Sequence, residues 1–151
     1  MTFQDPLENY DPKTYDDPIE EAICEASVTE IQHEPYTTIS PDETVAAALG
    51  KLATDHIACL MVEERGELIG VFTNREVLNK VALEGPDVLD RPVTEVMTPE
   101  PTSVRDDDPI AAALCAMAVH GYRHVPVLGS EGKIQGIVSP QRVTGFLSNL
   151  V

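Results

Sequence analysis

Two places in the sequence put a hydroxyl three residues after a glycine, where an apolar segment gives way to a helix signal. In the first, Thr73 is followed by Glu76, and in the second, Ser139 is followed by Pro140 and Arg142. Thr73-x-x-Glu76 is the pattern of a capping box, in which hydroxyl and carboxylate bind free N–H groups at a helix start. Ser139 before Pro140 is the pattern of an N-cap with proline at the first helical position. The same hydroxyls can also face a ligand, so a capping role and a binding role both stay open.

A basic pair, Arg123 and His124, stands directly before the apolar segment 125–128. A guanidinium can bind a phosphate through two parallel hydrogen bonds, which a carboxylate cannot do, and Arg142 offers the same chemistry. The alternatives are that Arg123 pairs with a surface acid and that His124 is a half-buried strand residue. Both interpretations are kept.

No other group of residues has the spacing of a catalytic or metal site. The cysteines, Cys24, Cys59 and Cys115, are odd in number and far apart, which predicts reduced, buried thiols rather than disulfides or metal ligands. The four histidines are dispersed, and the acids at 106–108 precede a proline, as acids at a helix start do. There is no P-loop, GxSxG or HExxH motif. We therefore expect no metal, no required cofactor and no enzymatic activity.

The chain has 151 residues with 26 acidic and 10 basic side chains, a net charge of −16. Such a charge repels phosphate backbones and anionic lipid surfaces, so neither a nucleic acid nor a membrane is an expected partner. No apolar run approaches the ~20 residues of a membrane span, and the first residues show no signal-peptide core. These features favour the cytoplasm.

The charge is unevenly distributed along the chain. Acids exceed bases by seven in residues 1–26, by seven in 27–88 and by two in 89–151. A phosphate-bearing ligand would therefore meet the least repulsion in the last segment. An acidic surface with four lysines also suits a high-salt cytoplasm.

The sequence repeats itself at an offset of 65 residues. The matching pieces are VTEI at 28–31 with VTEV at 93–96, TTI at 37–39 with TSV at 102–104, and VAAAL at 45–49 with IAAAL at 110–114. Each copy reads as β-α-β-β-α. Because one copy is too small to bury a sufficient core, we expect an α+β (α/β) fold in which two copies pack sheet against sheet about a pseudo-twofold axis.

The elements expected within each copy follow from capping, turn and periodicity signals. Helices are expected at about 44–54 and 109–120 and again at 74–84 and 140–149, with hairpins at 58–63 with 67–72 and 124–128 with 133–138. Ser40 to Glu43 predicts a capping box for the first helix. The expected organisation is an acidic, partly disordered arm at 1–26 with a short helix at 18–25, copy one at 27–84, a linker at 85–91 and copy two at 92–151.

These motifs, taken together and in order, resemble a known family. The pieces that carry the likeness are TTIS at 37–40, GVFTNREV at 70–77, VTEVMTPEPTSV at 93–104, YRHVPVL at 122–128 and GIVSPQRV at 136–143. They resemble the cystathionine-beta-synthase (CBS) domain, and two copies in tandem resemble a stand-alone CBS pair, or Bateman module, over residues 27–150. The resemblance implies a regulatory module that binds AMP, ADP, ATP, S-adenosylmethionine or NAD between its copies, forms a homodimer and signals to an unidentified partner protein.

The resemblance also implies two clefts. The cleft that contains the basic pair would be lined by Thr73, Glu76, Thr102, Ser103, Val104, Arg123, His124 and Val125. The second would be lined by Thr37, Thr38, Ile39, Ala58, Cys59, Ser139 and Arg142. In the family an aspartate binds both ribose hydroxyls, whereas here Glu76 is one methylene longer and Arg142 replaces the acid. The alternative is therefore a structural or protein-interaction CBS pair whose pockets bind nothing.

Overall fold

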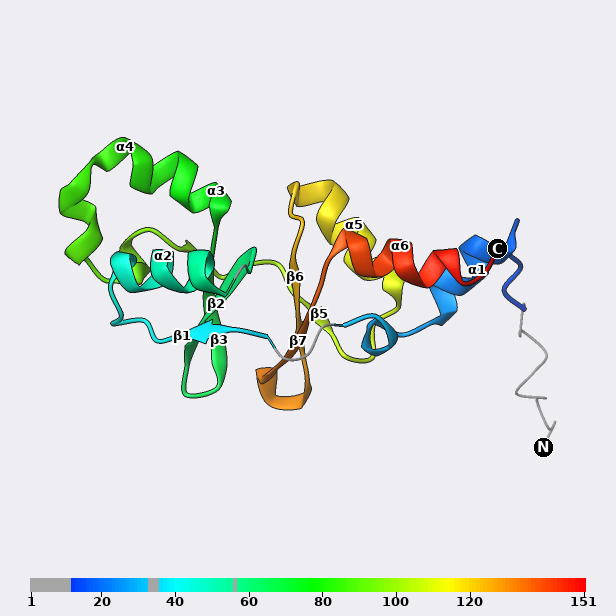
Figure 1. Ribbon diagram of the computed structural model, residues 1–151. Helices are drawn as coiled ribbons and strands as arrows, with labels where there is room; N and C mark the ends of the chain where they lie inside the picture. The colour runs from blue at the N-terminus through cyan, green and yellow to red at the C-terminus, as the bar shows by residue number, and fades with distance from the viewer. Residues whose placement is uncertain (1–11, 33–35, 56) are drawn as a thin grey trace, which may run out of the picture.

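The computed structural model describes residues 12–32, 36–55 and 57–151 of the chain. Two α/β units lie side by side in Figure 1, each built on its own small sheet. The first eleven residues of the predicted arm, and His33 and His56 among the dispersed histidines, lie outside the described residues.

The first repeat has the predicted order of elements. They are β1 (Thr38–Ile39), α2 (Val45–Thr54), β2 (Cys59–Glu64), β3 (Glu67–Thr73) and a helical run made of α3 (Asn74–Glu76), a π turn (Val77–Val81) and α4 (Ala82–Glu84). Strand β1 runs parallel to β2, and β2 runs antiparallel to β3. The hairpin turns at Arg65 and Gly66, whose φ values of 54° and 82° are left-handed and suit a tight turn.

The second repeat has the same topology. Its elements are β5 (Val104–Arg105), α5 (Ile110–His120), β6 (Val125–Leu128), β7 (Ile134–Val138) and α6 (Pro140–Ser148). Strand β5 is parallel to β6 and β6 is antiparallel to β7, in the sheet order β5-β6-β7. The predicted α+β fold of two β-α-β-β-α units is confirmed.

The segment that leads into each repeat packs on the other repeat. Before the second repeat, a 3₁₀ turn (Val93–Glu95) and strand β4 (Thr98–Pro99) join the first repeat, where β4 pairs with β3 and Val93 enters the core. Before the first repeat, helix α1 (Pro18–Glu25) and a 3₁₀ turn (Val28–Glu30) pack on the second repeat. The Val93 N–H donates to the Glu43 carbonyl at 2.8 Å, and the Val28 N–H donates to the Asp108 carbonyl at 3.0 Å. The two exchanges are equivalent, as a pseudo-twofold axis requires.

The two sheets share a third apolar cluster, in which the buried residues Cys59, Met61 and Val71 of the first repeat meet Ile134 of the second. Polar contacts flank it: the Tyr36 hydroxyl donates to the Ile134 carbonyl at 2.9 Å, and Lys133 Nζ donates to the Arg65 carbonyl at 2.8 Å. The expectation of sheet-against-sheet packing is therefore confirmed.

Two local expectations are wrong. The capping box at Ser40 does not form: α2 begins at Val45, Thr44 caps it, and Glu43 instead accepts from the Ser40 N–H at 2.9 Å within the preceding turn. The helix expected at 74–84 is present with those bounds, and its middle, Val77–Val81, is a π turn. Cys115 is exposed, because it lies on the outer face of α5, whereas Cys59 is buried as predicted. The short helix at 18–25 is confirmed.

The exchanged packing predicts where a core substitution acts. Val28 is fully buried in the core of the second repeat, so Val28→Ala should lower the free energy of unfolding by about 2 kcal/mol. Native-state hydrogen exchange should show the lost protection first in β6 and β7, although residue 28 precedes the first repeat in the chain.

Val93→Ala is the matched control, because Val93 is equally buried in the core of the first repeat. It should reduce protection first in β2 and β3. Loss of protection in β2 and β3 on substituting Val28 would contradict the exchanged arrangement.

Candidate functional site

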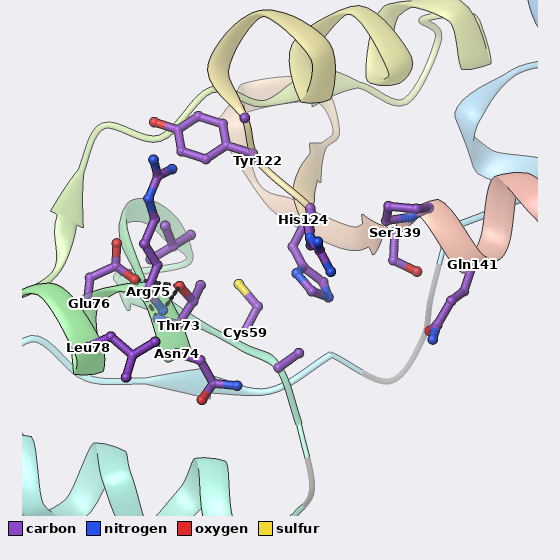
Figure 2. Close-up of a pocket in the computed structure, with 15 residues that line it drawn as sticks. Cys59, Thr73, Asn74, Arg75, Glu76, Leu78, Tyr122, His124, Ser139 and Gln141 are labelled. Atoms are coloured by element: carbon purple, nitrogen blue, oxygen red, sulfur yellow. Dashed lines mark hydrogen bonds between the residues drawn. The ribbon is translucent and has the colours of Figure 1, made fainter.

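A cavity of about 670 Å³ opens where the two repeats meet. Two strand-to-helix turns, β3 to α3 and β7 to α6, and the segments that enter β2 and β6 supply its walls (Figure 2). Its lining residues are Ala58, Cys59, Val71, Thr73, Asn74, Arg75, Glu76, Leu78, Gly121, Tyr122, Arg123, His124, Ser139, Pro140 and Gln141. The volume falls in the range of small-molecule sites, ~300–1,000 Å³.

Thr73 and Glu76 form the predicted capping box at one wall. Glu76 is only 4% exposed, and one of its carboxylate oxygens accepts from the Thr73 N–H at 2.8 Å and the Thr73 hydroxyl at 2.6 Å. Its other oxygen accepts from the Thr98 hydroxyl on β4 at 2.7 Å. The glutamate therefore holds the leading segment of the second repeat against the first, and both of its oxygens are already engaged by the protein.

Basic side chains line the cavity from both repeats. Arg75 and Arg123 are exposed, and His124 is half-buried beside Arg123. Burial, and secondly the charge of Arg123, lower the pKa of His124, so its imidazole is neutral near neutral pH. The Arg75 guanidinium lies 6.0 Å from the ring centre of Tyr122, and Figure 2 shows it reaching from the Glu76 side toward that ring.

Cys59 and Ser139 also line the cavity, and their burial decides what each can do chemically. Burial, with a smaller effect from the charge of Glu76, raises the pKa of the Cys59 thiol to about 12, so this cysteine stays protonated and unreactive. Ser139 is buried at the N-cap position of α6, followed by proline as predicted, but its side chain makes no capping bond. Its hydroxyl lies on the cavity wall (Figure 2).

The structure brings together residues that the sequence assigned to two clefts. Thr73, Glu76, Arg123 and His124 from the first set line one cavity with Ala58, Cys59 and Ser139 from the second. The other predicted residues lie elsewhere.

Val104 and Val125 are buried in the core of the second repeat, and Thr102 and Ser103 are half-buried in the segment between β4 and β5. Thr38 and Ile39 border a separate, polar cavity of about 350 Å³ within the first repeat. Thr37 accepts a hydrogen bond from the Met61 N–H through its carbonyl, and Arg142 is exposed on α6.

Sequence reasoning missed four polar lining residues: Asn74, Arg75, Tyr122 and Gln141. All four lie inside the motifs that carried the resemblance, next to residues that were chosen. Only their positions in the sequence could have identified them, because each lies next to a strand-to-helix turn or at the entry to β6. Nothing in the sequence shows that Arg75 and Tyr122, from different repeats, meet.

The two repeats exchange their leading segments, and a cavity lined by arginines from both repeats opens between them. These features define a module of two tandem repeats with a cavity of the size that small molecules occupy. A family model described as the CBS domain matches residues 28–83 and 93–149. The chain therefore belongs to the CBS-domain family and is a tandem CBS pair.

Relatives and solved structures agree with this assignment. The chain is 30% identical over 113 residues to an uncharacterized 17.7 kDa protein of Acidianus ambivalens, covering 74% of this chain and 67% of that one. It is 32% identical over 106 residues to the CBS domain-containing protein CBSCBSPB1 of Arabidopsis thaliana, covering 70% of this chain but 20% of that protein, so it spans only about a fifth of that relative's length.

Among solved structures, the CBS domain NE2398 superposes with a TM-score of 0.72 at 27% identity, covering 82% of this chain and 98% of that one. PAE2072 from Pyrobaculum aerophilum, solved in complex with AMP, has a TM-score of 0.72 at 22% identity and covers 82% and 99%. The CBS pair of MJ0100, solved with 5′-methylthioadenosine and S-adenosylmethionine, has a TM-score of 0.73 at 20% identity and covers 83% and 98%. The last two show the likeness of fold.

Two features are absent from residues 12–32, 36–55 and 57–151. Over these residues no helix has the length and apolar character that crossing a membrane requires. The same residues hold no group of three or more His, Cys, Asp or Glu side chains placed to bind a metal ion.

Proposed function

We propose that this CBS pair is a non-enzymatic regulatory module that binds an adenine nucleotide, or a related adenosyl compound, in the cavity between its repeats. Occupancy shifts the relative geometry of the two repeats, and a partner protein responds to that geometry. The fold's solved neighbours support the ligand class, since PAE2072 was solved with AMP and MJ0100 with two adenosyl compounds.

The observation that carries the proposal is the charge of the cavity lining. The chain has a net charge of −16, yet two arginines, Arg75 and Arg123, line the cavity beside the neutral imidazole of His124. Among the described residues that line it, the one acid is Glu76, whose oxygens are hydrogen-bonded within the protein. A local excess of cationic side chains in an acidic protein is what an anionic ligand needs.

Different lining residues suit the phosphate and the ribose of a nucleotide. Arg123 and His124 suit the phosphate, because a guanidinium and an imidazole donate to its oxygens. The Ser139 hydroxyl and the Asn74 amide, on opposite walls, suit the ribose hydroxyls. Glu76 supports the wall instead of binding the ribose, because its hydrogen bonds already hold β4.

Calorimetric titration with AMP, ADP, ATP, NAD and S-adenosylmethionine tests the proposal. We expect saturable binding of at least one phosphorylated compound, weakened by Arg123→Gln and unaffected by Arg105→Gln, an exposed arginine outside the cavity. Absence of a heat change at millimolar ligand, with the protein shown to be folded, would refute it.

The state of His124 predicts a pH dependence of binding. The pKa of this imidazole is lowered in the free cavity by burial and by Arg123, and a bound phosphate would raise it again. Binding therefore takes up a proton, and by linkage the affinity for AMP should rise as the pH falls from about 8 to about 6.5, by at most about tenfold per pH unit. Titration calorimetry at several pH values measures it.

His124→Gln separates this effect from protonation of the phosphate itself, because that contribution is common to both proteins. The variant should lose the steeper part of the pH dependence. The thiol of Cys59 stays protonated throughout this range, so it adds nothing to the difference. Identical pH profiles for both proteins would show that His124 does not contact the phosphate.

A second function, an interaction module whose cavity binds no small molecule, is favoured by the engaged carboxylate of Glu76. Thermal unfolding with and without AMP discriminates the two. A ligand that binds only the folded state raises the midpoint, whereas a vestigial cavity leaves it unchanged.

We further propose a homodimer. Three large apolar side chains, Leu78, Leu83 and Val119, are 68%, 79% and 77% exposed. They lie on the helical run 74–84 and on α5, which follow the same edge of the molecule in Figure 1. Light scattering coupled to gel filtration tests this, and a monomer at all concentrations would refute it.

A further inference from the structure

The cavity has a contact across its mouth that joins the two repeats. Arg75 belongs to α3 of the first repeat, and Tyr122 belongs to the segment that enters β6 of the second. The guanidinium carbon of Arg75 lies 6.0 Å from the Tyr122 ring centre, and Figure 2 shows the two side chains pointing toward each other. Both residues also line the cavity.

The Tyr122 ring also has a contact within its own repeat. His120, at the end of α5, stacks on Tyr122 with ring centres 5.6 Å apart and an angle of 22° between their planes. The ring is therefore held in place by the second repeat whether or not Arg75 covers it. Arg75 is therefore the side chain of this pair that can move away from the contact.

The contact that holds Arg75 is a weak one. A cation over an aromatic ring at an exposed site is attracted less strongly than a guanidinium that makes two charge-assisted hydrogen bonds to a phosphate. Arg75 is exposed and forms no ion pair with any residue that the structure describes, whereas both carboxylate oxygens of Glu76 accept hydrogen bonds from Thr73 and Thr98. A phosphate that enters the cavity would therefore draw Arg75 away from the ring.

We propose that Arg75 is a second phosphate-binding residue, which exchanges its contact with Tyr122 for the ligand's phosphate. Arg75 of the first repeat and Arg123 of the second would then bind the same phosphate. This inference rests on the proposed function and narrows it: the cavity selects phosphorylated adenosine compounds over neutral or cationic ones. No covalent step is involved, and the released ring of Tyr122 offers an apolar face to the base.

The experiment compares AMP with adenosine, which differ only in the phosphate. Each is titrated calorimetrically into the wild-type protein, Arg75→Gln and the matched control Arg105→Gln, which removes an equal charge outside the cavity. Arg75→Gln should weaken AMP roughly tenfold and change adenosine less than about twofold, because it removes a charged hydrogen bond to the phosphate alone. Arg105→Gln should leave both unchanged.

A magnetic resonance readout follows the exchange directly. The Tyr122 ring should shift the side-chain δ-proton resonances of Arg75 upfield in the free protein. AMP should move them toward ordinary positions, and adenosine should not.

The outcomes separate the two proposals. If AMP binds wild-type protein and Arg75→Gln equally well, the role of Arg75 is refuted while the proposed function stands. If AMP and adenosine bind the wild type with equal affinity, the selection for phosphate is refuted. If no adenosine compound binds the folded wild type, the proposed function fails and this inference fails with it.

Discussion

Glu76→Ala should lower the free energy of unfolding by about 3 kcal/mol, since it leaves buried donors without an acceptor. Three hydrogen bonds to this carboxylate are lost, from the Thr73 N–H, the Thr73 hydroxyl and the Thr98 hydroxyl. Two of them fix the turn before α3, and the third fixes β4 to the first repeat. Urea denaturation followed by circular dichroism measures the change as a lower transition midpoint.

Glu76→Gln is the informative control. Its amide oxygen can still accept from the Thr73 N–H, while its amide nitrogen can donate to the Thr98 hydroxyl, so we expect a loss of about 1 kcal/mol. Equal losses for alanine and glutamine would show that the charge matters and the hydrogen-bond geometry does not. No loss for alanine would contradict the assigned role of Glu76.

Met61→Ala should be the other large effect. Met61 is fully buried in the cluster where the two sheets meet, so truncation should cost about 3 kcal/mol through lost burial and the space left behind. Because the cluster holds the repeats together, we also expect a lower slope of the unfolding free energy against urea, as the repeats begin to unfold separately.

Leu60→Ala provides the comparison within the same strand. Leu60 is equally buried but belongs to the core of the first repeat. It should cost a similar free energy without splitting the transition. A Met61→Ala protein that keeps the wild-type midpoint would show that the contact between the sheets contributes little to stability.

The sequence predicted the repeats because their signals are local. Strand, turn and helix signals recur at a fixed offset, and the hairpins and α5 lie within a residue or two of their expected positions. It assigned the wrong cap to α2, because Ser40 to Glu43 fits a helix cap and a simple turn equally well, whereas Thr44 caps the helix. The π turn at 77–81 left no signal that single-residue propensities would detect.

Less of the candidate site than of the fold could be predicted from the sequence. Thr73, Glu76, Arg123 and His124 were chosen from motifs, and one cavity brings them together. Whether a strand end faces that cavity or the core depends on how the two sheets meet, which is a long-range property. Val104 and Val125 lie in the core for that reason. The meeting of Arg75 with Tyr122 spans two repeats and has no counterpart in either motif alone.

The exchanged leading segments bear on how such a chain could arise. A single repeat cut out of this chain would keep a segment that it cannot use and would lack the one that fills its core. Two copies of such a half could repair each other by trading these segments symmetrically, whereas one copy could not. The arrangement is therefore what gene duplication and fusion would give from an ancestral half-length chain that was stable only as a domain-swapped pair.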